Sequence, residues 1–194
     1  MDKYKQLLNM FYEVGQLKRE KRAGWVLLGI PNPETVGEHI SRSVFIAFAL
    51  AKLEGADPYK AALISAFHEL PETRIGDTHK TAQRYLNKKE AEKKVMEEQF
   101  EAMPEEIASE LKELIFNFGE DRTKEQVVAR DADFVECAIQ AKEYLEQGYS
   151  QAQNWIDNCN KCIKTASGKK IMDLLEDSDS QDWYRSLKKI RRDS

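Results

Sequence analysis

The chain has 194 residues, of which 41% are hydrophobic and 33% charged, and its formal net charge is −4. This composition is typical of a globular protein and excludes a largely disordered chain. The acidic balance argues against general nucleic-acid binding, no apolar run is long enough to span a membrane, and the first residues lack a signal-peptide core. We therefore expect a cytoplasmic protein with neither a nucleic-acid nor a membrane partner.

Two short motifs have ordinary explanations. Cys159 and Cys162 form a single C-x-x-C pair without the second pair that a structural zinc site needs. We therefore expect reduced cysteines on a helix. The basic cluster at residues 188–192 is expected to be the solvated end of a helix, where positive charge is favourable.

Apolar residues recur at helical spacing along most of the chain, and strand patterns are nearly absent. No linker or repeat divides the sequence, so we predict one domain over residues 1–194. Its core covers about residues 5–147, and C-terminal helices follow over 150–194. The sequence predicts an all-α fold of roughly eight helices, over residues 2–20, 35–54, 58–70, 78–102 (as one or two segments), 104–117, 124–147, 150–166 and 181–191.

Two of these helices bear on function. The helix over 58–70 is apolar on almost all sides, which is typical of a central, buried helix, and Pro71 ends or bends it. His39 borders the apolar stripe of the helix that begins near Thr35, and this stripe comprises Val36, Ile40, Val44, Phe48 and Ala51.

Residues that commonly bind metals gather where the central helix ends. His68, Glu69, Glu72 and Asp77 lie within ten residues of one another. A buried carboxylate is expensive unless water or a cation compensates its charge. With His39 upstream and an aspartate downstream, three separate segments would each contribute ligands, as in metal centres built inside helical bundles.

The downstream segment offers two aspartates. In the helix over 124–147, Asp131 borders the main apolar stripe, and Asp133 lies on the other side. Periodicity slightly favours Asp131. The helix has apolar residues on both sides, so the pattern alone leaves both candidates open.

Two imidazoles and two carboxylates suit a divalent transition metal such as Mn, Co, Fe, Ni or Zn. Such a metal polarises a phosphate oxygen and lowers the pKa of a bound water. Glu72, just beyond the ligands, is placed to take a proton from the attacking water. The pattern therefore points to hydrolysis of a phosphate ester.

Four ordered blocks resemble the HD-domain metal-dependent phosphohydrolases, and among them the 5′-deoxynucleotidase branch. Together they extend over about residues 5–147. The blocks are Leu17-Lys18-Arg19 with Arg22-Ala23-Gly24-Trp25, Val36-Gly37-Glu38-His39, His68-Glu69-Leu70-Pro71-Glu72 with Gly76-Asp77, and Ala132-Asp133 with Glu136, Gln140-Ala141 and Glu143-Tyr144.

The resemblance implies an HD-domain helical bundle that removes the phosphate of deoxynucleoside 5′-monophosphates. It implies a divalent metal, with Mg added to the metals above, and a homodimer. It favours Asp133 over Asp131. It implies metal ligands at His39, His68, Glu69 and Asp133, and a catalytic carboxylate at Glu72. It implies that Arg22 contacts the phosphate and that Trp25 contacts the nucleoside. It implies two roles for Asp77, which binds a sugar hydroxyl and also belongs to the catalytic residues.

One residue departs from the family pattern, because Glu69 stands where the family has its name-giving Asp. Glutamate keeps the oxygen ligand and its charge but is one methylene longer. Two alternatives therefore stay open. Beside the 5′-deoxynucleotidase, they are an HD phosphohydrolase of another nucleotide and a helical module whose catalysis the glutamate impairs.

Overall fold

The computed structural model describes residues 2–116, 118 and 120–187. Helices make up its regular structure, and eight of them have ten residues or more, which confirms the all-α prediction. The α-helices are α1 (Lys3–Val14), α2 (Ala23–Val26), α3 (Val36–Glu54), α4 (Pro58–Phe67), α5 (Glu72–Ile75), α6 (Lys88–Ala102), α7 (Glu105–Ile115), α8 (Lys124–Glu146), α9 (Gln153–Cys162), α10 (Ala166–Glu176) and α11 (Asp182–Arg185); 3-10 helices cover Gly15–Lys18 (η1), Ala82–Arg84 (η2) and Ser150–Ala152 (η3).

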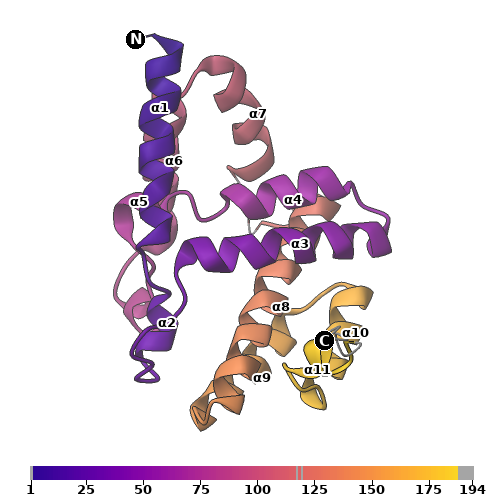
Figure 1. The fold of residues 1–194 in the computed structure, drawn as a ribbon. Coiled ribbons are helices and arrows are strands. Elements are labelled where there is room, and N and C mark those ends of the chain that lie inside the picture. Colours follow the sequence, from indigo (N-terminus) through magenta and orange to yellow (C-terminus); the bar gives the residue numbers. More distant parts are fainter. Residues whose placement is uncertain (1, 117, 119, 188–194) are drawn as a thin grey trace, which may run out of the picture.

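Three helices form the centre of the fold. α3 and α4 run side by side, and α8 crosses both of them (Figure 1). Small side chains fill much of their interface, and they allow the backbones to approach closely. The buried residues of this interface are Ala47, Leu50, Ala51, Ala61, Val128 and Ala132.

The ends of α3 and α4 follow from local sequence signals. Thr35 caps α3 in a reciprocal capping box with Glu38, and Gly55 ends the helix in the left-handed conformation at φ 67°. Asp57 then caps α4, with Pro58 at its first position. These signals fix where the two central helices begin, as predicted.

The predicted apolar stripe of α3 was wrong by about one position. The buried face is Val36, His39, Ser43, Ala47, Leu50 and Ala51, whereas Phe48 is exposed. Because α3 is apolar on nearly every side, periodicity could not choose the face that packing against α4 and α8 buries. His39 therefore lies in the middle of the buried face and not at its border.

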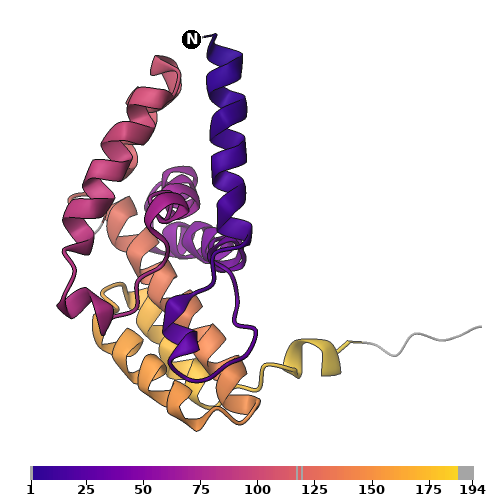
Figure 2. The same ribbon diagram turned by 90° about the vertical axis from the view of Figure 1, so that its left-hand side faces the viewer.

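The N-terminal helix belongs to a second layer. α1 and α6 stand upright beside the central helices, with α7 following α6 (Figure 2). A partly buried polar cluster ties α1 to α5 and α6. In it, Glu13 accepts hydrogen bonds from Thr73 Oγ1 at 3.1 Å, Arg74 Nε at 2.7 Å and Gln99 Nε2 at 2.7 Å.

The C-terminal region differs from the prediction. Residues 166–176 form α10, where the sequence predicted a break at Gly168, and α11 covers only part of the predicted 181–191 helix. Thr165 caps α10 by accepting from the Gly168 backbone N–H, and a Cβ on Gly168 would lie 2.8 Å from Ile163 Cγ2. Gly168 is therefore needed for close packing and does not break the helix.

Some predictions fall on residues that the structure does not describe. They are the end of the 104–117 helix at Asn117 and the basic cluster at 188–192. Within the described residues, no helix is both long enough and apolar enough to cross a membrane. The three cysteines are free, as expected.

Replacement of one buried leucine in α3 tests the central packing. Leu50 is fully buried, and Leu53 on the same helix is 70% exposed. We expect Leu50→Ala to lower the free energy of unfolding by about 2–5 kcal/mol, because it leaves a cavity between the central helices. The matched Leu53→Ala change should cost less than about 0.5 kcal/mol. Urea unfolding of both variants measures this, and equal losses would contradict the packing described here.

Candidate metal centre

Four potential ligands from three parts of the chain meet between the central helices. His39 comes from α3, His68 and Glu69 from the end of α4, and Asp133 from α8. One ligand atom from each residue lies within 4.8 Å of the ligand atoms of the other three. The sequence predicted these four residues as a set, and the structure brings all of them together.

The atoms of this cluster need a positive charge between them. His39 Nε2 lies 3.0 Å from Asp133 Oδ1, and His68 Nε2 lies 4.0 Å from the same oxygen. Among the described residues, His68 Nε2 and Asp133 Oδ1 are buried without a hydrogen-bond partner. Buried polar atoms are almost always paired, so this cluster fits a cation.

Both imidazoles direct Nε2 into the cluster. His68 Nδ1 lies 2.9 Å from the backbone oxygen of Ser65, and His39 Nδ1 contacts Glu136 Oε2. An acceptor at Nδ1 holds the hydrogen there and leaves the Nε2 lone pair free, which is the usual arrangement of a metal-binding histidine.

A second group of acids lies on the other side of His39, with ligand atoms of Glu34, His39 and Glu136 close together. These carboxylates already have donors. Glu34 accepts from Trp25 Nε1 at 2.8 Å, and Glu136 accepts from Arg42 Nε at 2.9 Å. The guanidinium supplies the positive charge here, so the first cluster is the better cation site.

The electrostatics of the cluster agree with this assignment. Burial and Arg22 lower the pKa of His39, but Glu136 and Asp133 outweigh them and raise it to about 10. Burial raises the pKa of Asp133, yet the two histidines and Arg22 hold it below its usual value. Without a metal, the cluster therefore retains a proton where a cation would bind.

The two candidate aspartates have different environments. Asp133 faces the histidines. Asp131 is fully buried and accepts hydrogen bonds from the backbone N–H groups of Lys164 and Thr165, at 3.0 and 2.6 Å. Periodicity favoured Asp131 because it is the more deeply buried of the two. Its carboxylate is used to hold the segment before α10.

Glu72 begins α5 immediately after the cluster. Its side chain is buried, its Oε1 accepts from Lys88 Nζ at 2.8 Å, and its Oε2 has no hydrogen-bond partner among the described residues. Burial, followed by the charges of Glu69 and Asp77, raises the pKa of Glu72 to about 9, although Lys88 opposes the shift. In the metal-free chain this carboxyl is therefore protonated at neutral pH.

Two more predicted residues reach this region, Arg22 from the segment before α3 and Asp77 from the segment after α5. Arg22 Nη1 lies 2.9 Å from Glu69 Oε1. Asp77 Oδ2 accepts from the Ala23 backbone N–H at 2.8 Å, and so fixes the loop beside Arg22. An arginine held by one carboxylate contact keeps further N–H groups for a ligand anion.

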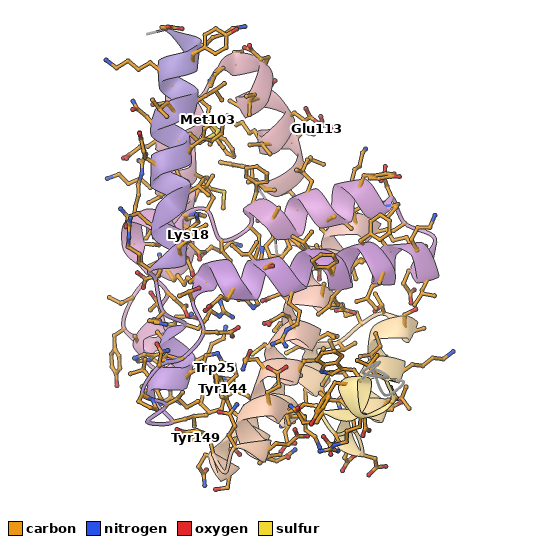
Figure 3. All side chains as sticks on the ribbon, viewed as in Figure 1. Lys18, Trp25, Met103, Glu113, Tyr144 and Tyr149 are labelled. Atoms are coloured by element: carbon orange, nitrogen blue, oxygen red, sulfur yellow. The ribbon has the colours of Figure 1, made fainter. Side chains whose placement is uncertain are left out.

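Trp25 is buried and does not lie on an open binding surface. It is 2% exposed, and its ring packs against Tyr144 and Trp155 at centroid distances of 5.2 and 5.5 Å. Figure 3 shows Trp25 and Tyr144 near one another below α3. The nucleoside contact assigned to Trp25 stays a prediction, and the structure shows it as a packing residue.

Three residues of the site received no role from the sequence. Glu136 and Arg42 hold His39 from behind, and Lys88 contacts Glu72. One signal was available for Lys88, because a lysine in the first turn of a helix opposes the helix dipole and needs another partner. Glu136 stands in the motif block around Asp133, but its contacts with His39 and Arg42 could not be predicted, because these partners lie far away in the sequence.

Comparisons with known proteins agree with this geometry. The model of the HD domain family matches residues 14–174. The 5′-deoxynucleotidase HDDC2 of Dictyostelium discoideum is 30% identical over 159 residues, which cover 77% of this chain and 82% of that protein. The Bos taurus protein of the same name is 28% identical over 157 residues, covering 79% of this chain and 76% of that protein.

Solved structures show the same fold. A crystal structure from structural genomics is 34% identical with a TM-score of 0.76, covering 93% of this chain and 99% of that one. A conserved hypothetical protein from Pyrococcus furiosus is 31% identical with a TM-score of 0.71, covering 87% of this chain and 98% of that chain. With its four converging ligands, the chain belongs to the HD-domain family of phosphohydrolases.

Proposed function

We propose that this protein is a metal-dependent 5′-deoxynucleotidase, which releases phosphate from deoxynucleoside 5′-monophosphates. The observation that carries the proposal is the cluster of four ligands with two unpartnered buried atoms. The names of the relatives from Dictyostelium discoideum and Bos taurus support the choice of substrate.

In this proposal His39, His68, Glu69 and Asp133 hold one divalent metal. The bound metal supplies a Lewis acid for a phosphate oxygen and lowers the pKa of a coordinated water. Two nitrogen and two oxygen ligands are compatible with Mn, Co, Fe, Ni, Zn or Mg, and they do not select among these metals.

Glu72 serves as the catalytic carboxylate that takes a proton from the attacking water. Lys88 holds one of its oxygens at 2.8 Å, which leaves Oε2 free for the water. The pKa of about 9 applies to the chain without a metal, and a neighbouring cation lowers it toward the neutral range.

Arg22 contacts the phosphate, since its guanidinium is buried beside Glu69 and has N–H groups to spare. Asp77 keeps the loop of Arg22 in place and offers its other oxygen to a sugar hydroxyl. Trp25 supports this loop from below. The homodimer, the cytoplasmic location and the single domain over 1–194 stay predictions.

Glu69 acts as a ligand despite the longer side chain. Its Oε1 lies 3.5 Å from His68 Nε2 and also reaches Arg22. One oxygen thus joins the metal ligands to the phosphate-binding arginine, and this supports a working site over an impaired one.

Phosphate release from a panel of nucleotides tests the proposal. We expect release from deoxynucleoside 5′-monophosphates with Mn²⁺, Co²⁺ or Mg²⁺, and none with EDTA. Glu72→Gln should lower kcat by about 10²- to 10⁴-fold, because the amide cannot take the proton. The matched control is Glu92→Gln, which changes the other carboxylate in contact with Lys88, at 3.1 Å, and should retain activity.

The same panel separates the alternatives. Release only from triphosphates or cyclic nucleotides would favour another HD phosphohydrolase. Inactivity of the parent chain with activity in Glu69→Asp would mean that the glutamate impairs the site. Inactivity of both on every substrate would contradict the enzymatic proposal.

The pH dependence of metal binding tests whether the metal-free cluster holds a proton. The pKa of His39 is raised to about 10 in the metal-free protein, so at neutral pH a proton must leave when a metal binds. We expect the affinity for Co²⁺ to rise by about tenfold per pH unit between pH 6 and 8, with about one proton released. Calorimetry in two buffers of different ionisation enthalpy measures both, and an affinity independent of pH would contradict the assignment.

A further inference from the structure

The two histidines of the metal centre are oriented by different kinds of partner. His68 Nδ1 faces the backbone oxygen of Ser65, which lies in the same helical turn. His39 Nδ1 faces the side chain of Glu136, which is 97 residues away on α8. The backbone oxygen stays in place whatever side chains surround it, so only the orientation of His39 depends on a remote side chain.

Glu136 is held in turn by Arg42. The guanidinium donates from Nε to Glu136 Oε1 at 2.9 Å, from Nη2 to Gln140 at 2.7 Å and from Nη1 to Glu143 at 2.7 Å. These partners lie four and three residues apart on α8, so they share one face of that helix. The planar fork of an arginine matches such a row of acceptors, and lysine does not.

This chain of contacts runs from the surface to the metal cluster. At the outer end, Arg42 lines an open groove of about 700 Å³ together with Glu34, Gln140 and Tyr144. At the inner end, His39 and Glu136 are both fully buried. A ligand histidine that lies at the end of a buried carboxylate and an arginine is fixed in both tautomer and ring angle.

Stability alone does not account for this arrangement. A buried ionic pair recovers little more than its own desolvation cost, and apolar residues of similar size are often equally stabilising. The contact between α3, α4 and α8 is already supplied by small apolar residues such as Ala47 and Ala132. A charged network at this position is better explained by the ligand atom that it directs.

We propose that Glu136 is the positioning residue for the metal ligand His39, and that Arg42 keeps Glu136 in place. Glu136 retains the hydrogen on Nδ1, so that the Nε2 lone pair faces Asp133 and the metal. This inference rests on the proposed function in one respect, namely that the cluster of four ligands binds a divalent metal.

Titration of the full chain with Co²⁺, followed by its visible absorption and by calorimetry, tests the inference. We expect Glu136→Gln to weaken Co²⁺ binding by about 10- to 100-fold and to change the absorption spectrum. Arg42→Met should weaken binding less, because Glu136 remains. Glu146→Gln is the matched control, since it removes one charge from α8 outside the network, where Glu146 contacts Ser180; its affinity and spectrum should stay unchanged.

The thermal melting of the metal-free variants separates positioning from a structural role. Weaker binding and a changed spectrum with an unchanged melting temperature support the positioning role. If Glu136→Gln does not fold, Glu136→Asp decides, because it keeps the charge but falls short of His39 and should also bind Co²⁺ weakly. A folded Glu136 variant with the affinity and spectrum of the parent chain would overturn the inference alone. A parent chain that binds no Co²⁺ would overturn the metal centre, and the proposed function with it.

Discussion

The structure depends on one electrostatic constraint, which is that two imidazole nitrogens and two carboxylates from three parts of the chain converge in a largely buried cluster. His39 Nε2 and Asp133 Oδ1 are 3.0 Å apart, and His68 Nε2 points to the same space. Low polarity makes such an arrangement costly unless a proton or a metal ion occupies it. The raised pKa of His39 and the lowered pKa of Asp133 are two results of this single constraint.

The central helices are built so that these acceptors can meet. Alanines between α3, α4 and α8 allow the backbones to approach closely, and this brings side chains from residues 39 and 133 into contact. The same close packing excludes water, which strengthens every charge interaction inside the cluster. Packing and chemistry are therefore coupled, since a looser interface would separate the ligands and also admit solvent.

Around this centre, each charged group has a partner that sets its position. Arg22 is held by Glu69, Glu72 by Lys88, and Glu136 by Arg42. Two of these pairs join segments that are far apart in the sequence, since Arg22 and Glu69 are 47 residues apart and Arg42 and Glu136 are 94 residues apart. Within the part of the chain that the structure describes, positive and negative side chains thus pair around the site, and the four converging ligands form a group to which a cation would add the missing positive charge.

The sequence by itself determined the helical class, the starts of α3 and α4, and three of the four ligand positions, namely His39, His68 and Glu69, because capping residues, helical periodicity and ligand types are local signals. It also identified Glu72 and Arg22 as neighbours of the site through a resemblance in ordered motifs. Only the tertiary structure decided which face of α3 is buried, because that helix is apolar on almost every side. The resemblance favoured Asp133 over Asp131, and the tertiary structure gave the physical reason, because Asp133 faces the two histidines whereas Asp131 accepts hydrogen bonds from the backbone before α10. Glu136 already stood in the motif block around Asp133, but its contact with Arg42 emerged from the fold alone, because a contact across 94 residues leaves no periodic trace in the chain.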